Sequence, residues 1–187
     1  MGLRRIQTVT LVSGQTVRFL VTRIGRSAIA LPAQWVRGIV MPTAAGRDGL
    51  VTWANVSYSQ TDLAGRLKIE PQGRSVETRL VLYGHEQQAR CFAVDKVVGL
   101  LDVERSMIHP LPAQFRGAER DRVLGFFADK ESVALIANPF WILDLPLRRN
   151  ALDVFALRVS EHRSGESDAR LQLPVATLEV VTSGHVG

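Results

Sequence analysis

Short runs of apolar and β-branched residues, separated by turn-forming residues, recur along most of the chain. The early runs span residues 7–12, 17–24, 27–32 and 35–40, and the later ones span 50–58, 78–83, 89–94, 96–103, 123–128 and 133–137. Such runs, at a spacing of roughly 8 to 12 residues and with little helix between them, are typical of small curled sheets and barrels. The pattern therefore predicts a mainly β fold whose helices are short turns.

The stretch from Cys91 to Pro112 is the most informative run in the chain. The density of valine and leucine over residues 97–103 predicts a strand that is buried on both faces. Gly99 lies inside this strand and indicates a bulge or bend where the sheet curves. Asp95 separates two apolar runs, so it either anchors a loop or an ion pair at the bend or faces solvent, because an unpaired charge is costly to bury.

Residues 62–67 are expected to form one or two helical turns, and we predict that Asp62 is the N-cap. The loop at 70–75 contains a proline and a glycine and is the best candidate for a boundary between subdomains. We therefore expect a domain over residues 1–144, with a first subdomain at about 17–70 and a second at about 76–144.

Residues 145–187 form an extension with its own pattern. Apolar residues occupy every second position over 155–159 and again over 176–180, with the polar stretch 160–168 between them. This alternation favours a β-hairpin with a long loop. A helix capped by Asn150 is the alternative for the first of the two segments, and the periodicity does not decide between them.

At 187 residues the chain is long enough to bury a stable core without disulfides. Its single cysteine, Cys91, excludes an intrachain disulfide framework, which favours a reducing, cytoplasmic setting. The N-terminal residues contain arginines but no long apolar core, so we expect no secretory signal. The most apolar run, 133–147, is interrupted by prolines, so we expect no membrane insertion.

The chain is basic, with a formal net charge of +5 and an isoelectric point near 10.1. A nucleic-acid-binding surface normally concentrates its charge on one face and interleaves aromatic residues. The 23 basic residues of this chain are instead scattered, so we interpret them as a solvated surface and expect no nucleic acid partner. A nucleic-acid-binding small barrel is the third functional hypothesis, and it depends on the isoelectric point alone.

None of the common catalytic or metal-binding motifs occurs in the sequence. Phosphate-binding GxxxxGK[ST], dinucleotide-binding GxGxxG, and the HExxH and CxxC metal motifs are all missing. The four histidines lie far apart, whereas a zinc site needs three or four ligands in paired spacing. Cys91 lies in an apolar strand and is better explained as a small core residue than as a nucleophile. We therefore expect neither an enzyme nor a bound metal or cofactor.

Six short motifs follow one another in a characteristic order. They are RFLV at 18–21 with Gly25, ALP at 30–32 with Val36 and Ile39, DL at 62–63 with RL at 66–67, VDKVVG at 94–99, IHPLP at 108–112, and the apolar stretch 133–143. Over roughly residues 17–144 this series resembles the CheW-like family of chemotaxis coupling domains. The resemblance implies two five-stranded SH3-like β-barrels related by pseudo-symmetry around an apolar core, with Asp62, Asp95 and Gly99 as structural motif residues.

The chain departs from the family pattern where that pattern has an acid and a base. Gly38 stands where the family commonly has glutamate, and Ala54, Asn55 and Ser59 stand where it has arginine, glycine and proline. If the two charges normally pair, the loss of one would strand a partly buried charge, whereas the loss of both can be nearly neutral. Asn55 fits a glycine position because asparagine tolerates left-handed backbone geometry better than most residues.

The resemblance implies a non-enzymatic adaptor that couples a chemoreceptor to the regulatory domain of a histidine kinase, in chemotaxis or pilus-type signalling. The alternative is a divergent CheW-like module that has lost receptor coupling and binds another partner or itself. Adaptor interfaces depend on a desolvated apolar centre with aromatic anchors.

The candidate binding residues lie in and near the ALP segment, where strand alternation leaves apolar side chains for a partner. They are Leu31, Trp35, Val36, Ile39 and Trp53. The competing interpretation for each is an ordinary core position, since buried apolar residues outnumber interface ones. Trp53 is the strongest candidate because it precedes Ala54, where the expected arginine is missing.

Overall fold

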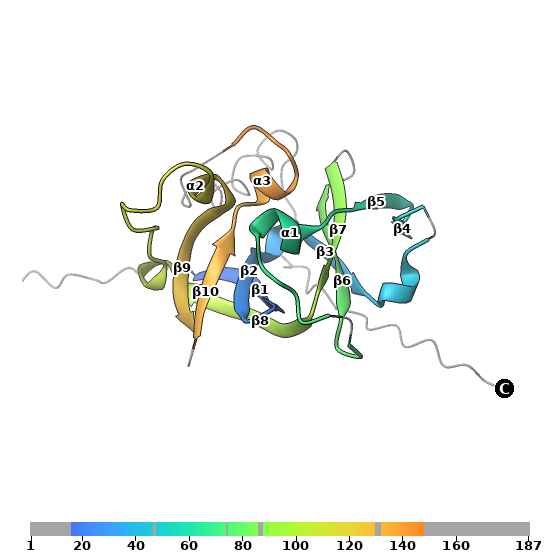
Figure 1. The fold of residues 1–187 in the computed structure, drawn as a ribbon, viewed down its shortest axis with the longest axis horizontal. Coiled ribbons are helices and arrows are strands. Elements are labelled where there is room, and N and C mark those ends of the chain that lie inside the picture. Colours follow the sequence, from blue (N-terminus) through green and yellow to red (C-terminus); the bar gives the residue numbers. More distant parts are fainter. Residues whose placement is uncertain (1–15, 47, 74, 86–87, 130–131, 148–187) are drawn as a thin grey trace, which may run out of the picture.

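The computed structural model describes residues 16–46, 48–73, 75–85, 88–129 and 132–147. Ten strands in these residues form two five-stranded sheets, which Figure 1 shows side by side. The first sheet has the order β8 (Lys96–Glu104), β1 (Thr16–Ile24), β2 (Ser27–Pro32), β10 (Ser132–Ala137) and β9 (Val123–Asp129). The second has the order β3 (Val36–Val40), β6 (Arg79–His85), β7 (Gln88–Val94), β5 (Val56–Gln60) and β4 (Leu50–Trp53).

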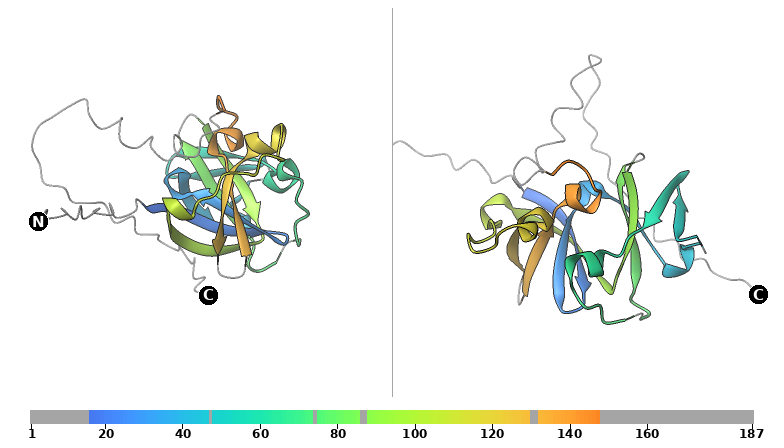
Figure 2. Two further views of the ribbon diagram at one scale, coloured as in Figure 1. Left: turned by 90° about the vertical axis from the view of Figure 1, so that its left-hand side faces the viewer. Right: turned by 45° about the horizontal axis from the view of Figure 1, so that its top comes forward.

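The described α-helices are short: α1 (Leu63–Leu67), α2 (Ala118–Arg122) and α3 (Pro139–Ile142). The right-hand view in Figure 2 shows α1 and α3 between the two sheets. This architecture confirms the predicted mainly β fold with two five-stranded units and short helical turns. No helix among the described residues is long and apolar enough to cross a membrane.

The chain divides its strands between the sheets differently from the predicted division at residues 70–76. Strands β1 and β2 begin the first sheet, β3 to β7 then build the second, and β8 to β10 return to complete the first. The loop at 70–75 lies between α1 and β6. The strands before it (β5) and after it (β6 and β7) belong to the same sheet, so the loop does not separate the two sheets. The composition of a loop shows that the chain turns there, but it does not show which distant strands will pair.

Two local predictions in the strands need correction. The run at 50–58, predicted as one strand, is the hairpin of β4 and β5, in which Trp53 pairs with Val56 across a two-residue turn. Strand β8 was expected to be buried on both faces, but it is an edge strand, and every second residue from Lys96 to Asp102 is exposed. The predicted run at 7–12 and the extension from residue 148 lie outside the described residues.

The predicted irregularity at Gly99 is present in β8. Val21 of β1 pairs with Gly99, but the next residue, Thr22, pairs with Val97, so Val98 is an extra residue in β8. Gly99 has a φ of 147°, which residues with a side chain rarely adopt. The resulting bulge bends the edge strand, as bulges at sheet edges commonly do.

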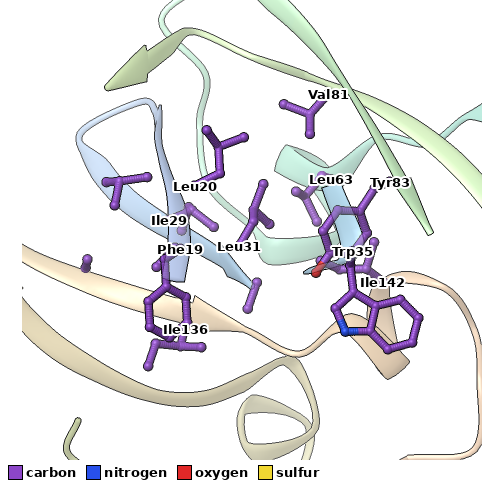
Figure 3. Close-up of a cluster of buried hydrophobic side chains, with 14 of the residues drawn as sticks. Phe19, Leu20, Ile29, Leu31, Trp35, Leu63, Val81, Tyr83, Ile136 and Ile142 are labelled. Atoms are coloured by element: carbon purple, nitrogen blue, oxygen red, sulfur yellow. The ribbon is translucent and has the colours of Figure 1, made fainter. Parts of the chain in front are cut away.

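The main core lies between the two sheets and takes side chains from both (Figure 3). Phe19 of β1 and Ile136 of β10 contribute from the first sheet, Val81 and Tyr83 of β6 contribute from the second, and Leu63 contributes from α1. Complete burial of an apolar side chain of this size stabilises a protein by about 1.5 to 3 kcal/mol. Because one core serves both sheets, we expect them to unfold together.

A smaller apolar cluster fills the interior of the second sheet. It contains Val51, Tyr58, Leu80, Leu82, Ala89 and Cys91. Burial raises the pKa of the Cys91 thiol, which disfavours the thiolate and its nucleophilic chemistry. Cys91 is thus a small core residue, as predicted from its apolar strand.

Candidate protein-interaction surface

Asp62 and Asp95 both hold backbone segments in place. The Asp62 carboxylate accepts a hydrogen bond from the backbone N–H of Gly65 at 2.9 Å, which is the geometry of an N-cap for α1. The Asp95 carboxylate accepts hydrogen bonds from the backbone N–H groups of Gly25 at 2.6 Å and Gln72 at 2.9 Å. Asp95 therefore links the β1–β2 turn to the loop after α1, which is the geometry of a loop anchor.

The five predicted binding residues fall into three groups by exposure. Leu31 and Trp35 are buried in the main core, where no partner can reach them without local opening. Val36 and Ile39 on β3 are half-buried and pack against the same core. Trp53, at the end of β4, has 37% of its surface exposed. Of these five residues, Trp53 is the one that offers a large exposed apolar surface.

The turn after Trp53 has an unusual backbone for its sequence. Ala54 has a φ of 48° and Asn55 a φ of 62°, so both central residues of the β4–β5 turn are left-handed. A two-residue hairpin turn with positive φ at both positions favours asparagine and glycine. Asn55 meets this requirement as expected, whereas alanine in a left-handed conformation costs roughly 1 to 2 kcal/mol.

Trp53 packs over Gly38, the residue at the family's usual acid position. A Cβ atom added to Gly38 would lie 3.5 Å from Nε1 of Trp53 and 3.4 Å from Cδ1 of Leu82. Strands β3 and β4 are the two edges of the second sheet, so the indole spans from one edge to the other. We call this contact of Trp53 with Gly38 the β3–β4 contact. A glutamate at position 38 would place its side chain against the indole.

The residue before Gly38 on β3 is basic. Arg37 of β3 donates a hydrogen bond from Nε to the carbonyl oxygen of Gly84 at 2.7 Å. Burial raises the pKa of the Tyr58 hydroxyl, and the positive charge of Arg37 partly opposes that rise. The positive charge of Arg37 is therefore directed toward Gly84 and Tyr58 of the same sheet.

A contact that the sequence pattern did not predict joins α3 to α1 and the second sheet. The guanidinium of Arg66 in α1 donates to the Trp141 carbonyl oxygen at 2.8 Å, to an oxygen of the Asp144 carboxylate at 2.8 Å, and stacks 4.4 Å from the centre of the Trp141 ring. Arg90 of β7 also approaches Asp144, at 3.7 Å. In the sequence Arg66 is part of a family motif, and no local signal indicates that its partners follow β10.

An apolar groove on the first sheet was also missed, and we call it the β10 groove. It has a volume of about 440 Å³, and its principal apolar residues are Ile29, Leu67, Leu111, Phe115, Val133 and Leu135. Its floor includes the face of β10 opposite to Ile136, and its walls come from the chain after α1 and from the segment before α2. The run at 133–137 is apolar at every position and was predicted only as a strand, so its pattern did not show that residues 133, 135 and 137 would line a groove.

No cluster of three or more metal-ligating side chains occurs in the part of the chain that the structure describes. Two surfaces in that part of the chain offer apolar area, namely the partly exposed aromatic residue at the β3–β4 contact and the β10 groove. Both can bury apolar area against a protein segment, which is the chemistry of a binding surface.

Comparison with known proteins agrees with this fold. The CheW-like domain family model matches residues 18–146. Among solved structures, the scaffolding protein TtCheW from Thermoanaerobacter tengcongensis is similar, with a TM-score of 0.58 and 17% sequence identity over 70% of this chain and 90% of that chain. No curated protein matches. Because the family match spans both sheets and their shared core, this chain belongs to the CheW-like domain family.

Proposed function

We propose that this chain is a non-enzymatic cytoplasmic adaptor that couples a chemoreceptor to a histidine kinase in chemotaxis or pilus-type signalling. The observation that carries the proposal is the family match over residues 18–146, which includes every strand of both sheets except the first two residues of β1. Large apolar residues that are exposed on this fold, Trp53 among them, support the same function.

The expected contact with the kinase regulatory domain is centred on Trp53. An aromatic side chain that is already partly packed loses little conformational freedom on binding, which makes it a suitable anchor. Val36 and Ile39, which are half-buried on the adjoining edge strand β3, would extend the apolar contact. Leu31 and Trp35 support this surface from the core below it.

A second function is favoured by the replacement of both family charges. Gly38 and Ala54 carry no charge, and Trp53 occupies the space over Gly38. A receptor surface that requires the acid and the base would no longer be matched here. The alternative proposal is therefore a CheW-like module that has lost receptor coupling and binds another protein, or a second copy of itself, through the apolar surface at Trp53.

The test is titration of the full chain with the regulatory domain of a histidine kinase encoded by the same genome. Trp53→Ala should weaken binding by about 30-fold, equivalent to roughly 2 kcal/mol, if Trp53 is a hot spot. Leu50→Ala is the matched control, since Leu50 is on the same strand, is 39% exposed, and lies on the opposite face. Trp53→Phe, which keeps an aromatic ring over Gly38, should retain most of the affinity.

The outcomes separate the two proposals. Unchanged binding by a folded Trp53→Ala variant would place the kinase contact elsewhere. Failure of the unmodified chain to bind any kinase regulatory domain or receptor would contradict the coupling function. In that case, concentration-dependent dimerisation in sedimentation experiments that Trp53→Ala abolishes would support the self-binding alternative.

A further inference from the structure

Strand β8 has an outer edge that no described strand pairs with. It lies at one end of the first sheet and pairs with β1 alone among the strands that the structure describes. Figure 1 shows it along the lower side of that sheet. The backbone groups on the outer side of an edge strand can pair with a strand from another chain. The side chains of β8 therefore decide which chain fits there.

The exposed face of β8 has an apolar centre with a charge at each end. Along the strand this face presents a base, two apolar residues and an acid, namely Lys96, Val98, Leu100 and Asp102. Val98 has 52% of its surface exposed and Leu100 has 46%. The alternate residues Val97 and Leu101 pack against the main core instead. The exposed apolar pair is thus available to a partner without any change in the core.

This face is complementary to itself in one antiparallel register. Residues that lie directly opposite each other in an antiparallel pair point to the same face, so the exposed residues of one strand meet those of the other. If Gly99 lies opposite Gly99 of a second copy, Lys96 meets Asp102 and Val98 meets Leu100. The two-fold symmetry makes each of these contacts occur twice. Opposite-charge pairs and apolar pairs across strands both stabilise a sheet.

The neighbouring registers do not give this match. A pair centred on Leu100 would place Val98 opposite Asp102, and a pair centred on Val98 would place Lys96 opposite Leu100. Both registers set a charge against an apolar side chain, which removes water from the charge without supplying a partner. A shift by a single residue would place the exposed face of one strand opposite the core-facing residues of the other. The pattern of β8 therefore selects the register centred on Gly99.

The charged side chains at the two ends can each take a further partner. Asp102 accepts two hydrogen bonds from Arg18, and Lys96 donates one to Glu77 at 2.6 Å. The side chain of Asp102 is still 49% exposed and that of Lys96 is 51% exposed. A carboxylate oxygen can accept more than one hydrogen bond, and an ammonium group has three donors. Charges would then alternate in sign across the junction, in the order Arg18, Asp102, and Lys96 and Glu77 of the second copy.

Two features of β8 disfavour other strands as partners. A lysine and a bulge on an edge strand both protect it from unspecific pairing. Lys96 fits only opposite an acid, which a second copy of this chain supplies. The bulge lies at the centre of the proposed pair, and a Cβ atom built at Gly99 would have no described atom of its own chain within 4 Å. The position on the two-fold axis is therefore open.

We propose that two copies of this chain associate through antiparallel pairing of β8, with Gly99 on the two-fold axis, Lys96 of each copy paired with Asp102 of the other, and Val98 against Leu100. This pairing joins the first sheets of both copies into one continuous sheet. Because one strand from each copy makes a small interface, the dimer should be reversible and dependent on concentration. The contact goes beyond the proposed coupling function and is separate from Trp53, which is on β4 of the second sheet.

Sedimentation of the full chain over a concentration series from about 1 μM to 1 mM tests the proposal. The parent chain should shift from monomer to dimer as its concentration rises. Lys96→Glu and Asp102→Lys should each weaken the association by about 10-fold, because in a symmetric dimer each substitution turns both ion pairs into pairs of like charge. An equimolar mixture of the two variants should associate again, since positions 96 and 102 then carry opposite charges in both contacts of the heterodimer.

Two control variants keep the test specific. Glu104→Lys reverses the charge of another exposed acid on the same strand, which has no charged residue opposite it in the proposed register. It should change the dissociation constant by less than about 3-fold. Trp53→Ala should leave the dimer unchanged, which distinguishes this contact from self-association through Trp53.

Each of the opposite results would overturn the proposal. A parent chain that stays monomeric throughout the series would show that β8 does not pair, and a dimer that resists both charge reversals or is lost in Trp53→Ala would have its interface elsewhere. An effect of Glu104→Lys as large as that of Asp102→Lys would show the register centred on Leu100, in which Glu104 faces Lys96. If the mixture of the two variants did not associate, the single substitutions would act on the strand itself and the charge pairing would be wrong. None of these measurements involves a kinase or a receptor, so their failure would leave the proposed coupling function untouched.

Discussion

In the first sheet a backbone bridge brings together the chain after β8 and the edge strand β9, whereas in the second sheet a side chain makes the equivalent contact between β4 and β3. His109 and Phe126 exchange hydrogen bonds of 2.8 and 2.9 Å. Trp53 instead lies over Gly38. The two sheets otherwise share one pairing pattern, in which a single parallel pair, β2 with β10 or β5 with β7, is flanked by antiparallel pairs.

The difference explains where this chain could depart from its family. We call the contact that links the two edges of each sheet its closure. A closure made by backbone groups tolerates many side chains, provided that the two backbones can approach each other. A closure made by a side chain depends on the residues that this side chain contacts. A substitution at one of these positions therefore alters what fits at the others. The missing acid, the missing base and the tryptophan over Gly38 all lie at the second kind of closure.

The largest expected effect comes from blocking the backbone bridge. A Cβ atom at Gly125 would collide with the carbonyl oxygen of His109, and backbone cannot move aside easily. Gly125→Ala should therefore lower the free energy of unfolding by about 3 kcal/mol, measured by chemical denaturation. Gly38→Ala is the matched control at the other closure and should cost less than about 1 kcal/mol, because its new methyl group meets side chains at ordinary contact distances. Equal losses would contradict the distinction between the two closures.

The next effect tests whether the family's charges can be restored. Gly38→Glu should destabilise the protein by roughly 2 kcal/mol, since it places an unpaired carboxylate against Trp53 and Leu82. Adding Ala54→Arg should recover about 1 kcal/mol in a double-mutant cycle. Gly38→Gln with Ala54→Arg should show no such recovery, because the amide carries no charge. Purely additive effects in the charged pair would mean that positions 38 and 54 do not communicate.

A smaller gain is expected at the turn of the second sheet. Ala54→Asn should stabilise the protein by about 0.5 kcal/mol, because asparagine adopts the left-handed conformation at φ 48° with less strain than alanine. Ala113→Asn in an exposed loop is the control and should change the midpoint of thermal unfolding little. Destabilisation by Ala54→Asn would show that the alanine methyl group makes a contact that outweighs the backbone strain.

The smallest effect concerns an ion pair at the edge of the first sheet. Arg18 donates two hydrogen bonds to the carboxylate of Asp102, and this bonding lowers the pKa of that carboxyl group below its ordinary value. A carboxyl whose pKa is lower in the folded than in the unfolded state adds stability above its unfolded pKa, and this stability is lost as the pH falls through the folded pKa.

Asp102→Asn should therefore lower the denaturation midpoint slightly at pH 7, and the difference from the parent protein should vanish as the acid range is entered. Because both side chains are solvent-exposed, added salt should also reduce the difference. A difference that grows on acidification would have the wrong sign for this pair.

Local sequence patterns were sufficient for several features of this protein. The β-branched runs placed most strands because side-chain alternation is a property of each strand by itself. The cap at Asp62, the bulge at Gly99 and the left-handed Asn55 could be predicted because each depends on the conformation of a few consecutive residues. The order of six motifs was enough to predict family membership, which the family match confirms.

Other features depend on partners that are far away in the sequence. Strand β8 is rich in valine and leucine, and its exposure follows from its place at the edge of a sheet. The separation of β4 from β5 could not be predicted because Ala54 is not a usual turn residue. Among the candidate binding residues, Leu31 and Trp53 had similar apolar contexts, yet one is in the core and the other is partly exposed.

Most strands, the cap at Asp62, the bulge at Gly99 and the family membership followed from the sequence, because they depend on short-range periodicity, local backbone preference and motif order. The tertiary structure alone decided that β8 to β10 return to the first sheet, that Trp53 covers Gly38, and that Arg66 reaches the chain after β10. Such contacts join residues tens of positions apart. They depend on the burial of the whole core, and no single segment of the sequence specifies that core.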